Sequence, residues 1–364
     1  MDKIKNITIP NNSRIIVISD IHGEIELFKE LLKKVHFNKE DYLIINGDLC
    51  EKGSNSEAVV KYIMELSSKS LKVHVTEGNC DTLAEDLLDG NPDLIEYLYH
   101  RPHSILNEWL DQLGMSLNER LNIQEVKELL TKHFSEEMKW LTNLPTAIET
   151  DRYIFVHAGL EDKKDWKNTK RDNAITMSSF LEKTHSTDKY VIVGHWPVVN
   201  YSSDTPSHNP IIDEKKKIIA IDGGNVIKET GQLNALIIER TVDAESFSYV
   251  YADPFPTCKV VKDFCKDPRM KGSIEYPFYE IIPLEENNDF TLCEQTETNR
   301  QVYVKNEYIS RNKKGRSTVK TDVSCTQINV NAGDIVSVID DTCSAYVLIK
   351  KDGKVGWVAK ECIR

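Results

Sequence analysis

The feature that most constrains the fold is an alternation of apolar strands and amphipathic helices in the first eighty residues. Short runs rich in Ile, Val and Leu indicate buried strands at Arg14–Ser19, Tyr42–Asn46 and Leu71–Thr76. Between them, Glu24–Val35 and Ser56–Ser68 carry apolar residues at helical spacing. This order predicts parallel strands joined by crossover helices, and therefore an α/β fold.

The pattern changes twice further along the chain. A helical stretch is expected over about Leu83–Leu144, and strands then resume at Tyr153–His157, Tyr190–Gly194, Lys217–Asp222 and Leu233–Ile238. We place a boundary near Asp243, which gives a first domain of residues 1–242 and a β-rich connecting segment of 243–298. Residues 299–364 alternate apolar and polar side chains between turns, which predicts a small all-β domain.

Polar side chains follow the expected strands where each strand ends. These runs are Asp20-Ile21-His22-Gly23, Gly47-Asp48, Gly78-Asn79-Cys80-Asp81, His157-Ala158-Gly159 and Gly194-His195. Because ligands of open α/β sheets bind outside the carboxyl ends of strands, we expect these side chains to meet in one crevice. Oxygen and imidazole donors suit Mn²⁺, Fe or Zn²⁺, and six donors suit two ions bridged by one carboxylate better than one ion.

These motifs, in this order, resemble those of the calcineurin-like metallophosphoesterases over about residues 13–240. The most similar group is the phosphoprotein phosphatases and their bacterial relatives, which include symmetrical dinucleoside tetraphosphate hydrolases. Further motifs of that bacterial subgroup are Glu136-Glu137-Met138-Lys139-Trp140-Leu141 and Ile221-Asp222-Gly223-Gly224. The resemblance implies an αββα sandwich with a helical insertion at about 83–144.

The resemblance also implies the role of each ligand. The first ion is held by Asp20 and His22, Asp48 bridges, and the second ion is held by Asn79, His157 and His195. A hydroxide bridging two divalent ions, Mn²⁺ by first expectation and otherwise Fe or Zn²⁺, would attack phosphorus. Asp222 either supports this site or only forms a turn.

Two positions depart from the family pattern. The family's phosphatases usually have a proton-donating His where this chain has Cys80, and an Asp that holds it where this chain has Glu51. A thiol is mostly protonated at pH 7 but is a poorer hydrogen-bonding group than imidazolium, so we expect weakened acid catalysis that favours good leaving groups. The alternatives are that Cys80 is an inert space filler or a redox-sensitive thiol.

The second departure concerns the groups that hold phosphate. Lys52 stands where the family's protein phosphatases have an Arg, and it offers a point charge without a bidentate fork. Asn79 would also face the phosphate, and Arg171 is the candidate for a further Arg between the last two His motifs. The catalytic set that the resemblance implies is Asp48, Cys80 and Glu51.

The last domain, residues 299–364, resembles a bacterial SH3-like barrel. The resemblance rests on Ala332-Gly333-Asp334, Tyr346 and Gly353-x-x-Gly356-Trp357-Val358. It implies a protein or peptide ligand, an intramolecular contact or dimerisation, and the alternative is a stabilising appendage.

The first functional expectation is a hydrolase that acts on phosphate esters in the manner of a serine/threonine protein phosphatase. The alternatives are a dinucleoside polyphosphate or cyclic nucleotide phosphodiesterase, and a weakly active scaffold that binds phosphorylated ligands. A net charge of −12 argues against nucleic acid as a partner. Met1–Pro10 lacks the apolar stretch of a signal peptide, no apolar run reaches membrane-spanning length, and the eight cysteines are scattered, so we expect a cytoplasmic protein with reduced thiols.

Overall fold

The computed structural model describes residues 1, 3–115 and 122–363, which form two compact units. The first unit contains residues 1–198 and 210–252, and the second contains residues 199–209 and 253–364. Within the described ranges, no helix is long and apolar enough to cross a membrane.

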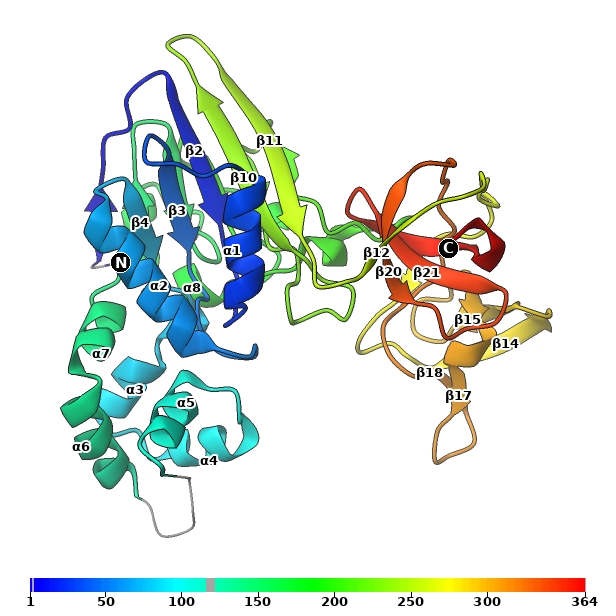
Figure 1. Cartoon of the computed structure of the whole chain (residues 1–364), viewed down its shortest axis with the longest axis horizontal. Helices are drawn as coiled ribbons and strands as arrows, with labels where there is room; N and C mark the ends of the chain where they lie inside the picture. Colours follow the sequence, from blue (N-terminus) through cyan, green and yellow to red (C-terminus); the bar gives the residue numbers. More distant parts are fainter. Residues whose placement is uncertain (2, 116–121, 364) are drawn as a thin grey trace. The chain divides into compact units, whose positions relative to one another are not determined.

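The first unit is built on two stacked sheets (Figure 1). One has the strand order β11 (Glu245–Ala252), β10 (Leu233–Arg240), β2 (Ser13–Ile18), β3 (Tyr42–Asn46) and β4 (Val73–Thr76). The other has the order β1 (Ile4–Asn6), β5 (Ala147–Glu149), β6 (Tyr153–Val156), β7 (Tyr190–Val193), β9 (Ile218–Ala220) and β8 (Ile211–Asp213). In the first sheet, β2, β3 and β4 are parallel, as the strand–helix alternation predicts.

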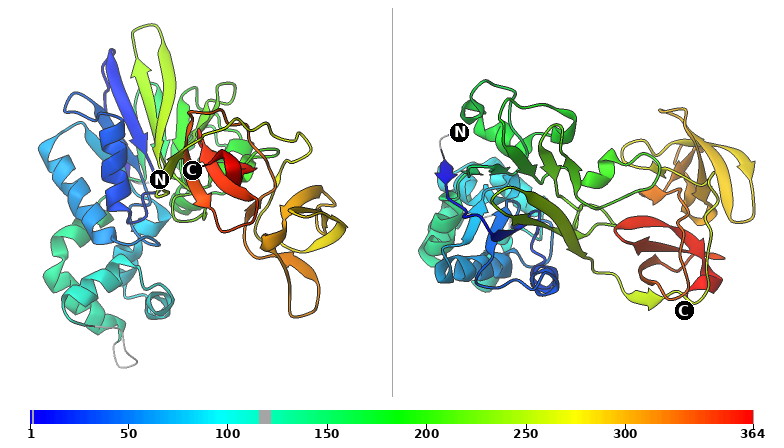
Figure 2. Two further views of the ribbon diagram at one scale, coloured as in Figure 1. Left: turned by 45° about the vertical axis from the view of Figure 1, so that its right-hand side comes forward. Right: turned by 90° about the horizontal axis from the view of Figure 1, so that it is seen from above.

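Helices cover both outer faces of the stacked sheets. The apolar sides of α1 (Ile25–Lys34) and α2 (Ser56–Lys69) pack on the outer face of the first sheet, whose inward-facing residues meet those of the second sheet. The outer face of the second sheet packs against a segment that contains the short helix α8 (Arg171–Thr176). In the right-hand view of Figure 2 the blue helices and the green segments lie on opposite sides of the strands. The predicted αββα sandwich is therefore confirmed.

In the described residues between β4 and β5, where a helical insertion is expected, the chain forms five helices. They are α3 (Leu83–Asp89), α4 (Asp93–His100), α5 (Ile105–Gln112), α6 (Ile123–His133) and α7 (Ser135–Thr142). Glycine or a capping side chain explains several ends: Gly90 ends α3 with a left-handed φ of 71°, and Asn122 accepts a hydrogen bond from the backbone of Glu125 at the start of α6. The fully buried Trp109 stacks on Phe134 at a ring distance of 4.8 Å and belongs to the same core as α1 and α2.

The second unit contains only short strands and 3-10 turns in its described residues. Its largest sheet has the order β12 (Thr257–Lys259), β20 (Ile335–Asp340), β21 (Tyr346–Lys351) and β22 (Lys354–Ala359). A three-stranded sheet has the order β14 (Ile281–Glu286), β15 (Phe290–Gln295) and β16 (Gln301–Lys305). Two small pairs complete it, β13 (Ser273–Ile274) with β19 (Val323–Ser324), and β17 (Ile309–Arg311) with β18 (Ser317–Val319).

The unit boundaries differ from those expected at residues 242 and 298. The turn between β10 and β11 contains Asp243, and β11 pairs with β10 along its whole length, so the first unit continues to Ala252. Residues 253–298 do not form a separate connection, because β12 pairs with β20 and β15 pairs with β16. Local alternation in the sequence could not reveal the pairing of β12 with β20, because these two strands lie far apart in the chain.

Candidate metal centre

Strained loops carry the predicted ligands at the carboxyl ends of the strands. Asp20, His22, Asp48 and His195 have φ values of 56°, 49°, 53° and 64°, in the left-handed region that non-glycine residues seldom adopt. Such strain persists only where the surrounding structure imposes it, and it clusters at functional sites. Four of the six predicted ligands therefore show an independent sign of a functional site.

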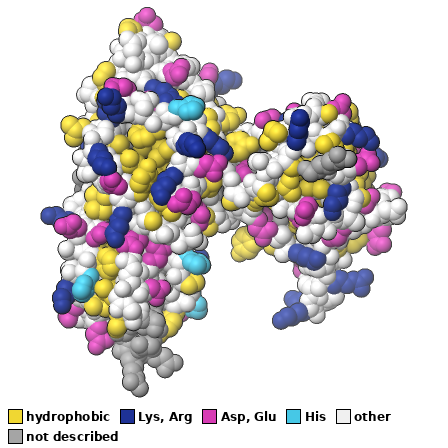
Figure 3. Space-filling view, in the orientation of Figure 1, with side chains coloured by type: hydrophobic (Ala, Val, Ile, Leu, Met, Phe, Trp, Pro, Cys, Tyr) yellow, Lys and Arg dark blue, Asp and Glu magenta, His cyan; other side chains and the backbone are white. Residues whose placement is uncertain are grey.

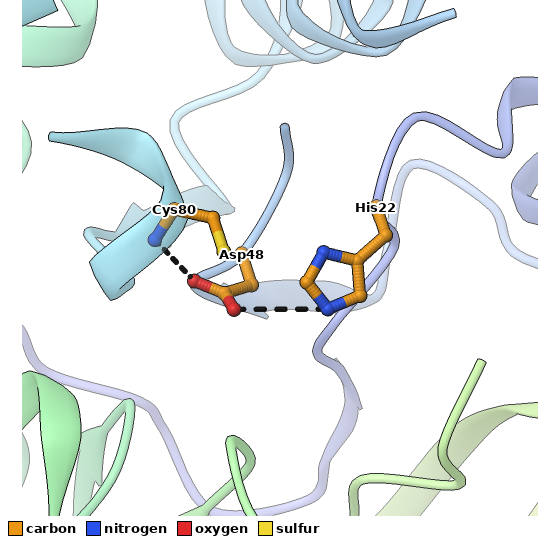
Figure 4. Close-up of side chains that lie close together, drawn as sticks. All are labelled: His22, Asp48 and Cys80. Atoms are coloured by element: carbon orange, nitrogen blue, oxygen red, sulfur yellow. Dashed lines mark hydrogen bonds and ion pairs between the residues drawn. The ribbon is translucent and has the colours of Figure 1, made fainter. Parts of the chain in front are cut away.

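The carboxylate of Asp48 lies at the centre of the cluster (Figure 4). Its Oδ2 is 3.7 Å from His22 Nε2, and its Oδ1 is 3.3 Å from His157 Nε2. The backbone N–H of Cys80 donates to Oδ1 at 2.9 Å. Ligand atoms of Asp48, His22 and Cys80 lie within 4.8 Å of one another, and so do those of Asp48, His157 and His195. Asp48 thus joins two donor groups, which is the position expected of a bridging ligand.

Hydrogen bonds to the backbone orient the two buried imidazoles. The Nδ1 of His22 lies 3.1 Å from the carbonyl oxygen of Cys50, and the Nδ1 of His157 lies 3.0 Å from that of Asn46. Because a carbonyl only accepts, each Nδ1 carries a proton and donates it. Each Nε2 then faces Asp48 and is available as a metal ligand.

Asn79 and His195 complete the side of the cluster around His157. Asn79 lies in the 3-10 turn η1 (Asn79–Asp81) after β4, and its Oδ1 is 3.3 Å from His157 Nε2. The rings of His157 and His195 are 5.1 Å apart, and the backbone of Thr176 in α8 bonds to His195. Three loops thus bring an amide oxygen and two imidazoles to one point.

Two buried carboxyl groups, Asp20 and Asp222, lie beside the cluster. Both side chains are almost fully buried, and the carboxylate of Asp20 accepts the backbone N–H of His195 at 3.2 Å. Burial, followed by repulsion from Asp222, raises the pKa of Asp20 well above its usual value. Asp222 also accepts the N–H of Gly224 at 2.7 Å, which closes a turn next to the cluster.

The donor set fits divalent cations. Burial would lower the pKa of His157, but Asp48 and Asp20 outweigh it and raise that pKa to about 10. The carboxylates of Asp48 and Asp20 therefore stabilise positive charge beside them. In the absence of a metal ion, this positive charge is the proton on His157 and the ammonium of Lys52. A divalent cation bound by these carboxylate, amide and imidazole groups would balance the same negative charge, and no ligand would need to be protonated.

Asp81 is a buried carboxylate to which the sequence interpretation gave no role. Its Oδ2 accepts the N–H groups of Asp48 and Gly78 at 2.9 and 2.8 Å, and its Oδ1 accepts those of Leu49 and Cys50 at 2.9 and 3.2 Å. These bonds hold the loop after β3 against the turn after β4, and so fix Asp48. The position of Asp81 in the Gly78-Asn79-Cys80-Asp81 motif is the sequence feature that could have indicated this role.

Glu51 is hydrogen-bonded to the helical insertion. Its Oε1 accepts the N–H of Ile105 at 2.9 Å and its Oε2 accepts the hydroxyl of Tyr97 at 3.0 Å, so both oxygens point to the helical insertion. Glu51 is therefore anchored to the insertion, and its support of Cys80 stays a prediction. Glu is one methylene longer than the Asp of the family, which lets the carboxylate reach the start of α5.

Cys80 and Lys52 do lie together at the site. The Nδ2 of Asn79 is 3.4 Å from the buried Sγ of Cys80. Burial and the neighbouring Asp48 raise the pKa of this thiol well above its usual value. Burial alone would lower the pKa of Lys52, but Cys80, Asp48 and Asp20 raise it, so Lys52 is a cation facing the carboxylates.

Arg171 is occupied by two carboxylates. Its Nε and Nη2 donate to Glu77 at 2.8 and 2.7 Å, and Nη2 also donates to Glu85 at 2.6 Å. Glu77 is 3% exposed in this ion pair. Among the candidate phosphate-binding groups, the structure brings Lys52 and Asn79 to the cluster, whereas it engages Arg171 in an ion-pair network.

Comparisons with known proteins agree with this geometry. Residues 13–221 match the family model described as calcineurin-like phosphoesterase. A symmetrical bis(5'-nucleosyl)-tetraphosphatase of Buchnera aphidicola is 33% identical over 134 residues, which cover 35% of this chain and 46% of the relative. The match thus spans less than half the length of that relative.

Two further comparisons cover more of the chain at lower identity. An asymmetrical bis(5'-nucleosyl)-tetraphosphatase of Oceanobacillus iheyensis is 22% identical over 257 residues, which cover 66% of this chain and 94% of the relative. A solved protein serine/threonine phosphatase from Saccharomyces cerevisiae aligns with a TM-score of 0.43 and 14% identity, and the alignment covers 70% of this chain and 85% of that one.

Proposed function

Because the chain belongs to the calcineurin-like phosphoesterase family, we propose that it hydrolyses phosphate esters or anhydrides at the site around Asp48. The observation that carries the proposal is the convergence on the Asp48 carboxylate of imidazole Nε2 atoms from His22 and His157, which lie 3.7 and 3.3 Å away. Buried donors in this arrangement have no evident structural purpose, since an apolar core would be less costly.

The family uses two divalent metal ions, and the buried donors fit them. Asp20, His22 and Asp48 would hold the first ion, and Asp48, Asn79, His157 and His195 the second. When bound, the ions polarise the phosphoryl group and lower the pKa of a bound water. We propose Mn²⁺ as the ion, with Fe or Zn²⁺ as alternatives, because the set combines oxygen and imidazole donors.

The chain's own residues then orient the substrate and manage the proton. Lys52 attracts the phosphoryl oxygens as a point charge, and the amide of Asn79 is placed to donate to them. Asp81 holds the Asp48 loop, while the backbone carbonyls of Asn46 and Cys50 fix the imidazole tautomers. The neutral thiol of Cys80 is a weak hydrogen-bond donor. It therefore protonates the departing oxygen of a poor leaving group inefficiently.

Weak proton donation bears on the substrate class. A phosphoanhydride leaves as a stabilised phosphate, whereas a serine or threonine side chain leaves as an alkoxide that needs a proton. We therefore favour dinucleoside polyphosphates, the substrate class named for the bis(5'-nucleosyl)-tetraphosphatases of Buchnera and Oceanobacillus. A protein phosphatase activity is the second candidate, supported by 26% identity over 171 residues to a Shewanella-like protein phosphatase of Plasmodium berghei.

A metal-supplemented substrate panel tests the proposal. The protein with Mn²⁺ is incubated with diadenosine tetraphosphate, a phosphoserine peptide, and mono- and bis-p-nitrophenyl phosphate, with the Asp48→Asn variant as control. We expect diadenosine tetraphosphate to be cleaved fastest, with two ADP marking symmetrical and ATP plus AMP asymmetrical attack. If the protein binds metal but turns over none of these substrates, the proposal is wrong and a phospholigand-binding scaffold takes its place.

We also propose that the second unit is an SH3-like module that binds a protein or peptide, and that the protein works in the cytoplasm. The β20–β21–β22 meander around the fully buried Trp357 supports the first proposal, and the eight free cysteines support the second. Both signs of charge are interspersed over the face seen in Figure 3, in keeping with a protein or nucleotide partner rather than nucleic acid. Affinity capture with the full-length protein tests whether the second unit binds a protein or peptide. Cell fractionation tests the cytoplasmic location.

A further inference from the structure

A second cavity lies in the first unit, away from the metal centre. It has a volume of about 700 Å³ and is bounded by α2, by the edge strand β4, and by α7 with the loop that follows it. Figure 1 shows these elements side by side. None of the six predicted metal ligands is among its lining residues. Its size is within the range of about 300–1,000 Å³ that is usual for small-molecule sites.

Most of the cavity wall is apolar. Met64 comes from α2, Val73 and Val75 come from β4, and Trp140 comes from α7. Leu71 also lines the cavity although 94% of its side chain is exposed. The exposed Leu71 adjoins the half-buried Trp140 and the two valines of β4. Together these side chains form an apolar surface that a ligand could cover.

The polar groups of the cavity are mainly hydrogen-bond donors. His74 is 8% exposed, and its Nδ1 lies 3.2 Å from the Lys5 ammonium, which can only donate. The Nε2 of His74 therefore carries the ring proton, and among the described residues it has no acceptor. The hydroxyl of Ser67, which also lines the cavity, is buried without a hydrogen-bond partner in the described part of the chain.

The charge of the cavity is positive. Burial, together with the nearby Lys5, lowers the pKa of His74 to about 4, so the ring stays neutral and the ammonium of Lys5 provides the charge. Lys139 on α7 is exposed and makes no ion pair with a described residue, and Glu136 is the one acidic side chain in the lining. Two ammonium groups against one carboxylate favour an anion.

From these observations we infer that this cavity is a binding site for a small aromatic anion. The planar body would lie against Trp140 and the aliphatic wall, and the anionic group would accept from His74 Nε2 and from the ammonium groups. An anion supplies an acceptor for the Nε2 donor of His74, which a neutral apolar ligand would leave unsatisfied. The inference does not depend on the proposed hydrolase activity.

The probe is 8-anilinonaphthalene-1-sulfonate, an aromatic anion whose fluorescence rises in apolar surroundings. It is titrated into the full-length protein at pH 7.5, with a Kd of roughly tens of micromolar expected for a ligand of this size. The variants are Leu71→Asp and Lys139→Glu, whose side chains are exposed and can change without disturbing the core. Lys33→Glu, an exposed lysine on α1, is the matched control.

We expect Leu71→Asp and Lys139→Glu each to weaken binding at least about fivefold, and Lys33→Glu to leave it unchanged. Naphthalene-1-sulfonate should displace the probe, whereas 1-naphthylmethylamine, of similar shape but opposite charge, should not. Equal affinity of all three variants, or equal displacement by the amine, would overturn the inference. A lack of displacement by naphthalene-1-sulfonate would overturn it as well.

Discussion

Replacement of Glu51 by Gln separates a catalytic role from an anchoring role. The sequence pattern assigns Glu51 to support Cys80, whereas the structure bonds it to Ile105 and Tyr97 of the insertion. Gln has the same shape and keeps an acceptor for the Ile105 N–H, and its amide can donate to the Tyr97 oxygen. The substitution therefore removes the charge and preserves the contacts.

The magnitude follows from the pKa of this carboxyl. Burial, only partly offset by the hydrogen bond from Ile105, raises the pKa of Glu51 from 4.5 to about 7. Because the folded pKa lies above the unfolded one, the folded state binds the extra proton between pH 4.5 and 7, and stability falls as pH rises through this window. At pH 8 the penalty reaches roughly 3 kcal/mol, and Glu51→Gln removes it.

Urea denaturation at pH 5 and pH 8, monitored by the fluorescence of the first unit, measures this effect. We expect Glu51→Gln to be more stable than the natural protein at pH 8, by about 1–3 kcal/mol, and this advantage to shrink at pH 5. Hydrogen exchange of the peptide containing Ile105 should show the same trend. Glu51→Ala should instead destabilise at both pH values by about 2–4 kcal/mol, because a buried N–H loses its acceptor.

Turnover provides the refuting result. If Glu51 only anchors the insertion, kcat of Glu51→Gln with Mn²⁺ stays within about threefold of the natural value. A fall of a hundredfold or more, with no change in the pH dependence of stability, would refute this reasoning and restore the role that the sequence suggested.

Four further outcomes are expected. Asp48→Asn should lower kcat about a thousandfold and reduce bound metal measured by elemental analysis, and full activity would contradict the metal centre. Cys80→His should raise turnover of alkyl phosphates about tenfold, measured by released phosphate, and no gain would favour an inert thiol. Arg171→Met should cost about 2–4 kcal/mol in urea unfolding because Glu77 loses its partner, and an unchanged midpoint would show the ion pair to be dispensable. Burial lowers the pKa of Lys350 from 10.5 to about 8, so between these pH values the unfolded chain binds a proton that the folded protein has released. The free energy of unfolding should therefore rise by up to about 3 kcal/mol between pH 8 and 10.5. Urea denaturation of Lys350→Met should show no such rise.

Much of the first unit was predictable because its order is local. The apolar runs at β2, β3 and β4 and the helical spacing of α1 and α2 fall within one or two residues of the expected bounds. The edge strand β1 was not expected, because three residues give no period to read. Strand ends are fixed by the same local patterns, which is why the sequence indicated the cluster of Asp48, His22 and His157.

What the sequence determined by itself is the α/β fold and the kind of chemistry at its strand ends, because hydrophobic period and residue type are local properties. Only the tertiary structure decided that Glu51 serves the insertion, that Arg171 is engaged by Glu77, and that Asp81 supports Asp48. The partner of a charged side chain is chosen by distances between segments separated by tens of residues. Such distances follow from how the whole chain packs, and no pattern along the sequence contains them.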